Sequence, residues 1–287
     1  MAHVIATINL KGGVGKSTTT VALAELLSAE FGKRVLVIDL DPQTNATVML
    51  IGEAKWKQQN DNNATLAQLF KDALTEDPDE RLFDLDEALV RRASNVDAVR
   101  NVDLLPSSID LIDVQDRLAS MPSGKFYANN PTDILRRAIK PIIDEYDIVL
   151  VDCPPNLGII TLNGLRIAGG YIIPTIPDVL STYGIPQILS RVAAFAENIG
   201  ETIEPLGIVI SKYRAQSTVH RNTTTDLRRR ATPRVFETVI AENNQIAESA
   251  EFMEFRPIAT LRQKYGYKGQ FDAYFALAQE VLAAVEA

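Results

Sequence analysis

Residues 4–20 read V-I-A-T-I-N-L-K-G-G-V-G-K-S-T-T-T, an apolar strand pattern followed by a glycine-rich loop and the beginning of a helical segment. The loop contains two lysines, Lys11 and Lys16, five positions apart. One lysine in such a loop is explained as a ligand of phosphate. The presence of two lysines in one loop therefore needs a further explanation, which the rest of the sequence helps to supply.

The segment Gly15-Lys16-Ser17, placed after a short apolar strand and before a helix, is typical of a phosphate-binding P-loop. Glycines let the backbone N–H groups curl around phosphates, and the helix N-terminus adds partial positive charge. We therefore expect Lys16 to neutralise the β- and γ-phosphates of a nucleotide and the Ser17 hydroxyl to bind Mg²⁺. The predicted nucleotide-binding residues of this loop are Lys11, Gly12, Gly13, Val14, Gly15, Lys16, Ser17 and Thr18.

The composition is that of an acidic globular protein with one cysteine. The chain has 287 residues, of which 46% are hydrophobic and 23% charged, and its formal net charge is −8. This charge argues against a wholly basic nucleic-acid binder, so any anionic partner must meet a local basic patch. Cys153 cannot form an internal disulfide, and we see neither a signal peptide nor an apolar run of the ~18 residues that span a bilayer. These features predict a cytoplasmic protein.

Short apolar runs rich in β-branched residues alternate with amphipathic segments along the chain. Runs such as V-L-V-I and I-V-L-V contain no polar residues, as expected for strands covered on both faces. The sequence therefore predicts an α/β fold, a mostly parallel twisted sheet with helices on both faces. The predicted strands are 3–8, 34–39, 102–105, 147–152, 170–174, 206–211 and 235–240, and the predicted helices are 17–30, 110–119, 131–145, 183–198, 218–230 and 270–285.

Residues 52–100 interrupt this alternation. The segment is rich in Asn, Gln, Asp and Glu, and D-N-N-A-T-L-A-Q-L-F and D-L-D-E-A-L-V-R-R within it have the pattern of surface helices. We interpret it as a helical elaboration of a single domain that spans residues 1–287.

The P-loop departs from the standard pattern, because its first glycine is replaced by Leu10 and Lys11 follows. This departure resembles the deviant Walker A box, K-G-G-x-G-K-[ST], of the ParA/MinD ATPases, and the resemblance is strongest to ParA-type partition ATPases. It extends from residue 3 to the C-terminus and is weakest in 52–100. The resemblance implies a P-loop NTPase-like fold and an ATPase that uses ATP and Mg²⁺, with slow intrinsic turnover.

The resemblance also implies a role for Lys11, the lysine that the standard P-loop lacks. Lys11 would reach across a two-fold interface to the phosphates held by the other subunit, which makes ATP binding and homodimer formation one event. Two ammonium groups in one loop repel unless anionic charge lies between them. A triphosphate shared between two subunits supplies that charge.

Three aspartates follow predicted strands. Asp39 and Asp41 lie two positions apart in D-L-D-P-Q, and Asp152 ends the apolar run I-V-L-V-D, so all three are expected at the carboxyl edge of the sheet, where ligands of such folds bind. By resemblance, Asp41 orients the attacking water, Asp39 supports the magnesium shell, and Asp152 holds Mg²⁺ through water. Lys11, Lys16 and Asp41 are thus the predicted catalytic residues. Thr44 occupies a position where family members usually carry glycine.

Two late segments resemble the family's nucleotide-base region. G-I-V-I-S-K-Y-R matches the strand and loop that border the adenine, and E-T-V-I-A-E-N-N-Q-I-A-E-S-A matches the following loop. Ser211 and the backbone near Ala241 are the candidates for contact with the base.

A local basic segment lies between residues 211 and 234. It contains seven Lys or Arg residues and one acid, Asp226. Together with the resemblance, this charge predicts non-specific contact with DNA phosphates, which carry no sequence information. Family members often have arginines in the loop after the last strand, where this chain has Asn243, Asn244 and Gln245, so the patch is confined to the helix. The predicted DNA-binding residues are Lys212, Arg221, Arg228, Arg229 and Arg230.

These observations favour a nucleoid-associated partition ATPase whose ATP-bound dimer binds DNA and is released when a ParB-like adaptor stimulates hydrolysis. The alternative is a MinD-like positioning ATPase that cycles on a membrane. That alternative needs basic residues on an amphipathic C-terminal helix, whereas the end, F-D-A-Y-F-A-L-A-Q-E-V-L-A-A-V-E-A, contains none. An iron–sulfur ATPase is excluded, because a cluster shared by two subunits needs two thiolates from each.

Overall fold

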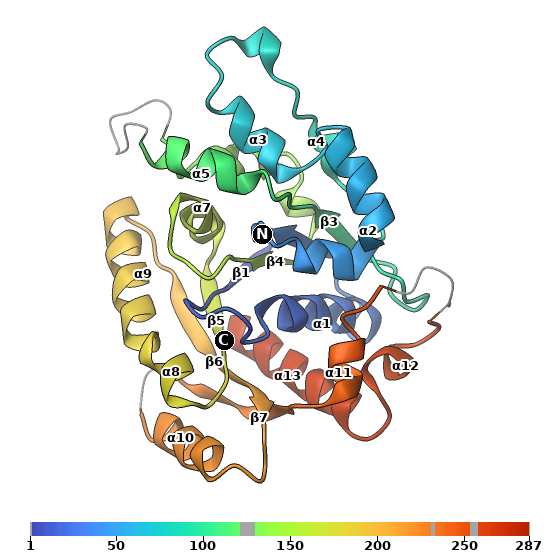
Figure 1. The fold of residues 1–287 in the computed structure, drawn as a ribbon, viewed down its shortest axis with the longest axis vertical. Coiled ribbons are helices and arrows are strands. Elements are labelled where there is room, and N and C mark those ends of the chain that lie inside the picture. Colours follow the sequence, from blue (N-terminus) through green and yellow to red (C-terminus); the bar gives the residue numbers. More distant parts are fainter. Residues whose placement is uncertain (1, 121–129, 231–232, 253–257, 287) are drawn as a thin grey trace.

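The computed structural model describes residues 2–120, 130–230, 233–252 and 258–286, and within them seven parallel strands form one sheet (Figure 1). The order of the strands is β3-β2-β4-β1-β5-β6-β7. This arrangement confirms the predicted parallel sheet, and each predicted strand is found within one or two residues of its expected bounds. The strands are β1 (His3–Thr7), β2 (Val35–Asp39), β3 (Val102–Leu105), β4 (Ile148–Asp152), β5 (Gly170–Thr175), β6 (Glu204–Tyr213) and β7 (Val235–Ala241).

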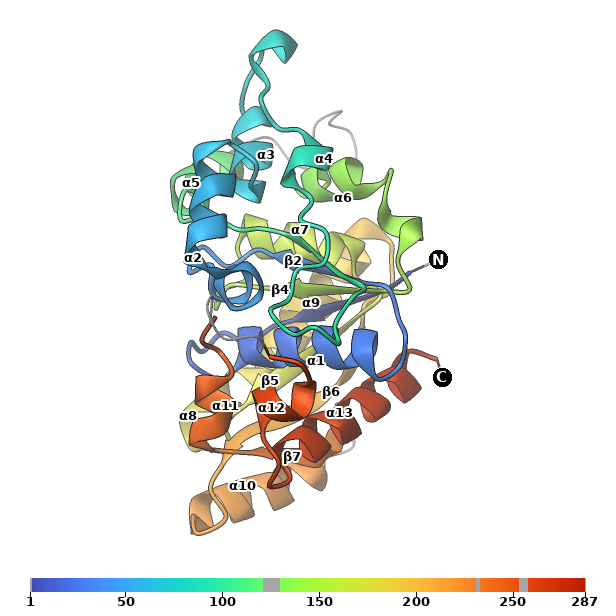
Figure 2. The ribbon, with the colours of Figure 1, turned by 90° about the vertical axis from the view of Figure 1, so that its right-hand side faces the viewer.

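The sheet is buried on both faces, which explains its uninterrupted apolar strands (Figure 2). In β2, Val35 and Val37 join the core on one face, whereas Leu36 and Ile38 join the core on the other. The helices packed on the Val35 face are α1 (Lys16–Ala29), α2 (Asn45–Asp61), α12 (Leu261–Tyr265) and α13 (Gln270–Val285). Those on the Leu36 face include α3 (Leu66–Asp72), α5 (Leu111–Ala119), α6 (Ile134–Ile139), α7 (Ile159–Ile167) and α9 (Ile185–Ile199).

One predicted helix is wrong in its bounds. The helix expected over 131–145 is α6 followed by a separate 3₁₀ turn, η2 (Ile143–Glu145), because Pro141 lacks an N–H and disfavours helix at the residue before it. The helix expected over 183–198 is found as α9 within two residues of its expected bounds, and Gly184 separates it from a further helix, α8 (Val179–Tyr183), that was not predicted.

The interrupted segment 52–100 does contain helices, but its first helix begins earlier. Helix α2 starts at Asn45 and is kinked at Gly52, whose φ of 75° is outside the helical region. It is followed by α3, the 3₁₀ turn η1 (Pro78–Glu80) and the short α4 (Leu85–Ala88). Leu66, Phe70 and Leu89 of this segment belong to the same core cluster as the sheet. On this packing we propose that the chain is a single domain.

The remaining described helices are α10 (Thr218–Arg228) and α11 (Asn244–Glu248), which lie on either side of β7 in sequence. None of the helices in the described ranges has the length and apolar character needed to cross a bilayer.

Candidate functional site

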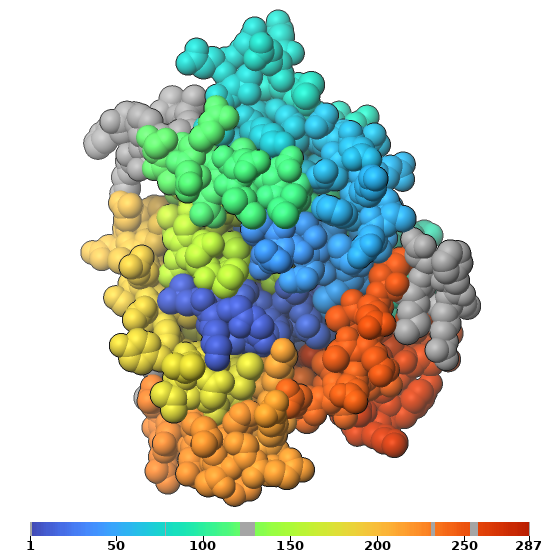
Figure 3. Space-filling model, viewed as in Figure 1, coloured from blue at the N-terminus to red at the C-terminus, as the bar shows by residue number. Residues whose placement is uncertain are grey.

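The loop between β1 and α1 encloses a hollow of about 320 Å³ at the carboxyl edge of the sheet, and its atoms reach the surface at the centre of Figure 3. Gly13 and Gly15 have φ values of 74° and 86°, a left-handed conformation that glycine adopts without strain. The hollow is therefore formed by the predicted P-loop. Its lining is Gly12, Gly13, Gly15, Lys16, Ser17, Thr18, Asp41, Gln43, Asn45, Val48, Met49, Pro155, Lys212 and Ala250.

The floor of this hollow is positively charged. Helix α1 begins at Lys16 without a side-chain cap, so its first N–H groups are available to an anion. Lys16 is only 6% exposed, and its ammonium lies 3.5 Å from the Lys11 carbonyl oxygen, which keeps it folded over the loop. The Ser211 hydroxyl donates to the Val14 carbonyl at 2.7 Å and thereby ties the loop to β6.

Asp39 holds residues 39–43 in place, the D-L-D-P-Q segment that corresponds to the first switch of the ATPases this sequence resembles and that we call the switch. One carboxylate oxygen accepts from the Asp41 N–H at 3.0 Å, and the other accepts from the N–H and hydroxyl of Thr47 at 2.9 and 2.7 Å. Burial raises the pKa of Asp39 to about 7, against the effect of these hydrogen bonds. With both oxygens engaged, Asp39 organises the turn that presents Asp41 to the hollow. Its expected support of the magnesium shell stays a prediction.

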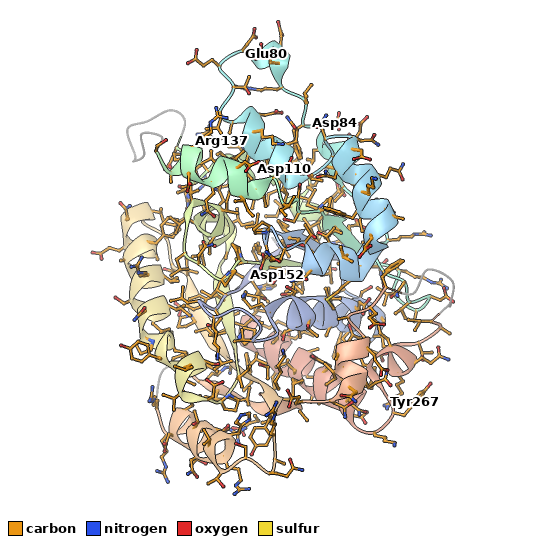
Figure 4. The ribbon with its side chains drawn as sticks, in the orientation of Figure 1. Glu80, Asp84, Asp110, Arg137, Asp152 and Tyr267 are labelled. Atoms are coloured by element: carbon orange, nitrogen blue, oxygen red, sulfur yellow. The ribbon has the colours of Figure 1, made fainter. Side chains whose placement is uncertain are left out.

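Asp152 is fully buried, and neither carboxylate oxygen has a hydrogen-bond partner among the described residues (Figure 4). Burial raises its pKa well above the usual value, the charge of Asp39 adds to this, and the nearby Ser17 hydroxyl and Lys16 ammonium oppose it. A buried carboxylate without partners costs folding free energy unless a cation compensates it. This orphaned group is the observation that fits a magnesium site.

Ser17 and Asp152 would hold Mg²⁺ here, directly or through water, and Asp39 would support them from β2. No three His, Cys, Asp or Glu side chains of the described ranges converge closely enough to bind a metal alone. The phosphate oxygens of the nucleotide would therefore complete the ligand set. When bound, the ion would neutralise charge on the phosphates.

Asp41, in the loop after β2, is among the residues that line the hollow. Burial raises its pKa, while the Gln43 N–H, donating at 2.9 Å, and the charge of Lys16 favour the ionised form. Its carbonyl accepts from the Ser107 hydroxyl at 2.7 Å, so the switch is also fixed to the segment after β3. A carboxylate fixed in this way beside the phosphate loop is able to orient a water molecule by accepting its proton.

Thr44 occupies the position where glycine was expected, and it adopts a φ of 56°. For a β-branched residue this left-handed conformation is strained. The backbone at position 44 thus keeps the left-handed conformation that glycine adopts most easily, although the residue here is threonine.

Lys11 does not line its own hollow. Its ammonium donates to the Ser181 hydroxyl at 2.9 Å and to Asp178 at 3.4 Å, at the N-terminus of α8. Asp178 also caps α8 by accepting from the Ser181 N–H at 2.6 Å. The two lysines of the loop therefore point to different environments, one inward and one to the rim.

Comparison with known proteins agrees with this site. A sequence profile described as an AAA domain matches residues 2–204. The chromosome-partitioning ATPase Soj of Thermus thermophilus is 32% identical over 98% of this chain and 96% of its own length. The sporulation initiation inhibitor protein Soj of Bacillus subtilis is 30% identical over 87% of this chain and 88% of its own. The chain belongs to the ParA/MinD family of P-loop ATPases.

A solved structure agrees on nucleotide and metal. The cobyrinic acid a,c-diamide synthase of Mycobacterium smegmatis, with bound ATP analogue and magnesium, superposes with a TM-score of 0.73 and 26% identity. The match covers 100% of this chain and 97% of that one. This ParA/MinD family member is accordingly an ATPase that uses ATP and Mg²⁺ and forms ADP and phosphate.

The predicted DNA-binding residues of this ATPase separate into two places. Arg221, Arg228, Arg229 and Arg230 lie on or just after α10, whereas Lys212 lines the nucleotide hollow. Acids near α10 offset part of the charge, since Arg229 pairs with Asp226, Arg228 with Glu237, and Arg214 with Glu242. Exposed pairs of this kind are weak and exchange readily with other anions. Four arginines, Arg221 and Arg228–Arg230, against Asp226 and Glu237 still leave a positive surface at α10.

The base-contact candidates are only partly near the hollow. Ser211 supports the P-loop, while Ala241, the last residue of β7, is not among the residues that line the hollow. Sequence reasoning missed Val48, Met49 and Ala250, which form its apolar wall. It also missed Asp178, although this acid lies three residues after the end of β5, at the edge of the sheet where the site is built.

Proposed function

We propose that this ATPase partitions DNA or another cargo by an ATP-controlled cycle. In this cycle the ATP-bound form is a sandwich homodimer that binds DNA non-specifically, and a ParB-like adaptor stimulates hydrolysis and releases it. The name of the Thermus thermophilus relative, a chromosome-partitioning ATPase that matches 98% of this chain, supports the partition role. The single observation that carries the proposal is the position of Lys11 at the rim of the P-loop.

The dimer follows from the direction of that lysine. Lys16 already serves the hollow of its own subunit, and Lys11 is turned to the outer surface, where it is 38% exposed. A second copy facing this surface would bring its own triphosphate within reach of Lys11. The attraction between a cation and a triphosphate then favours pairing only when ATP is bound.

The surface next to Lys11 has the character of an interface. Val179, Leu180 and Tyr183 of α8 are 70%, 76% and 74% exposed. Three large apolar side chains exposed together on one short helix are uncommon on a monomeric protein and favour burial against a partner. Their position beside the P-loop supports a second copy of this chain as that partner.

Hydrolysis in this scheme depends on Asp41, which orients the attacking water beside Lys16. The switch is held by Asp39 and Thr47 before any partner arrives, so intrinsic turnover is slow. Stimulation requires the adaptor to change this arrangement or to add positive charge at the phosphates.

DNA would be bound through Arg221 and Arg228–Arg230 on α10, in a cytoplasmic protein associated with the nucleoid. Phosphate contacts suit a protein that uses DNA as a surface without reading its sequence. The MinD-like alternative is less favoured, because Leu277 and Val281 of the last helix are buried in the core against α1 and β7. An apolar face used in this way is not available to a membrane.

The test is the oligomeric state by sedimentation velocity, with and without Mg-ATP, on Asp41→Ala protein to suppress turnover. We expect a monomer without nucleotide and a dimer with ATP, and expect Lys11→Ala to abolish the dimer while ATP binding is retained. An ATP-dependent dimer of normal affinity in the Lys11→Ala variant would overturn the proposal.

A further inference from the structure

The segment between α3 and α4, together with the first residues of α4, forms an arm over residues 73–87 that projects from the body of the molecule (Figure 1). Its sequence from residue 76 to residue 87 contains seven acids and a single base, Arg81. No ion pair within the described part of the chain involves any of the seven. These acids are Glu76, Asp77, Asp79, Glu80, Asp84, Asp86 and Glu87.

The arm is held in a defined position at its base. Asp72, which is 6% exposed, accepts from the N–H groups of Leu82 and Phe83 at 2.9 and 2.7 Å. Its other oxygen accepts from the Gln68 amide at 2.6 Å. The buried carboxylate of Asp72 fixes the second half of the arm to α3. The acidic side chains of the arm are therefore held in position before a partner binds.

A hollow of about 460 Å³ lies beside the base of the arm, between α3 and α6. Glu80 marks the tip of the arm and Arg137 the α6 side of the hollow in Figure 4. Leu82, next to the hollow, is 59% exposed. The apolar part of the lining is Leu69, Ala73, Phe83, Leu85, Ile134 and Ala138.

We propose that the arm and this hollow are a docking surface for a basic amphipathic segment of a partner protein. Its apolar side chains would fill the hollow, and its Lys and Arg side chains would lie along the acids of the arm. The orientation follows from charge, because Arg81 borders the hollow and repels cations there, whereas the acids towards the tip attract them. Helix-in-groove recognition uses this combination of apolar anchors and flanking charge.

The surface is connected to the nucleotide site through α3. The N–H of Leu66, its first residue, donates to the Pro106 carbonyl at 2.9 Å. The adjacent Ser107 donates to the carbonyl of Asp41. A partner segment that displaces α3 would therefore act on the switch. This effect on the switch rests on the proposed function, whereas the docking of the segment does not.

The test is fluorescence anisotropy with a labelled helical peptide of leucine and lysine, the leucines on one face. We expect Glu76→Gln, Asp77→Asn, Asp79→Asn and Glu80→Gln together to weaken binding at least about tenfold at low salt. The matched control neutralises Asp144, Glu197, Glu248 and Glu251, exposed acids elsewhere for which the described residues give no ion pair, and should change binding less than about twofold.

A second variant tests the hollow without changing charge. Ala138→Phe fills it and should weaken the same peptide about tenfold. A peptide with serine in place of leucine should bind poorly and should not distinguish Ala138→Phe from the wild type. Unchanged binding in both the arm and the hollow variants would overturn the proposal. Self-association of the chain that the arm variant abolishes would assign the surface to a second copy and would also overturn it. Melting temperatures of the same variants show whether a loss of peptide binding is due to misfolding. ATP-dependent dimerisation of the same variants shows separately whether the proposed function fails.

Discussion

Lys11 and Asp178 form an ion pair of 3.4 Å at the rim of the nucleotide hollow, although Lys11 belongs to the phosphate-binding loop itself. The pair joins the first loop of the sheet to the cap of α8, residues 167 positions apart in the chain. Lys11 therefore has a carboxylate partner within its own subunit. A role across the interface requires it to give up that partner.

This competition predicts the effect of Asp178→Asn. The side chains are 38% and 32% exposed, so the pair contributes about 1 kcal/mol or less. The variant keeps an acceptor for the Ser181 N–H, and α8 stays capped. We expect ATP-dependent dimerisation to become tighter by up to about fivefold, measured by sedimentation equilibrium. Weaker dimerisation would instead mean that Asp178 contributes to the interface.

Asp152 gives a prediction about stability and pH. Its pKa is raised in the folded protein, so the folded state binds a proton more strongly than the unfolded state does. The stability due to this protonation is complete below the unfolded pKa, about 4, and is lost as pH rises towards the folded pKa. Asp152→Asn removes the titration.

Without nucleotide or Mg²⁺, the melting temperature of Asp152→Asn should therefore exceed that of the wild type by an amount that grows from pH 5 to pH 8. The same variant should lose the stabilisation that Mg-ATP gives to the wild type. Scanning fluorimetry across this pH range measures both effects. A difference that does not depend on pH would contradict the titration of Asp152.

The sequence was sufficient for the sheet, because strands covered on both faces must be apolar throughout and P-loop glycines occur in one structural context. The sequence was less informative where the surroundings of a side chain depend on residues distant in the chain. Asp39 and Asp152 are alike in sequence, each ending an apolar strand, but Thr47 satisfies the first and nothing among the described residues satisfies the second. The kink at Gly52 and the location of Lys212 likewise depend on packing that no local pattern encodes.

Thr44 predicts a stabilising substitution. Its φ of 56° costs a β-branched residue roughly 1–2 kcal/mol, and glycine is free of that strain but loses more backbone entropy on folding. We expect Thr44→Gly to raise the free energy of unfolding by about 0.5–1 kcal/mol in urea titrations. Thr44→Ala is the matched control, because alanine retains the strain and should give no gain. Equal effects of the two substitutions would show that the backbone conformation is not the cause.

The α10 surface predicts a salt-dependent interaction with DNA. Replacing Arg228, Arg229 and Arg230 by alanine should weaken ATP-dependent binding to duplex DNA at least about tenfold and should lower the slope of log affinity against log salt. A control variant, Arg262→Ala, removes an exposed arginine of α12 that pairs with Asp272 of α13. Binding to duplexes of different sequence should fall equally, since phosphates carry no sequence information. An unchanged salt slope would remove α10 from the DNA surface.

The buried pair of Glu25 and Lys264 predicts a large loss of stability. Glu25 lies on α1, behind the P-loop, and its side chain is fully buried, while that of Lys264 on α12 is 1% exposed. The ammonium donates to the carboxylate at 2.7 Å, and the Tyr265 hydroxyl donates to the other oxygen at 2.6 Å. Lys264→Met leaves this carboxylate buried with only neutral partners and should cost about 3–5 kcal/mol, measured by urea denaturation.

The double variant Glu25→Gln/Lys264→Met separates charge from packing. It removes both charges while it keeps side chains of similar volume and an acceptor for Tyr265, so it should recover most of the loss caused by Lys264→Met alone. Because α1 carries the phosphate loop, the single variant should also bind ATP more weakly, and the double variant should regain that affinity. If the double variant is no more stable than Lys264→Met, the aliphatic contacts of the lysine stem, not the ion pair, hold α12 against α1.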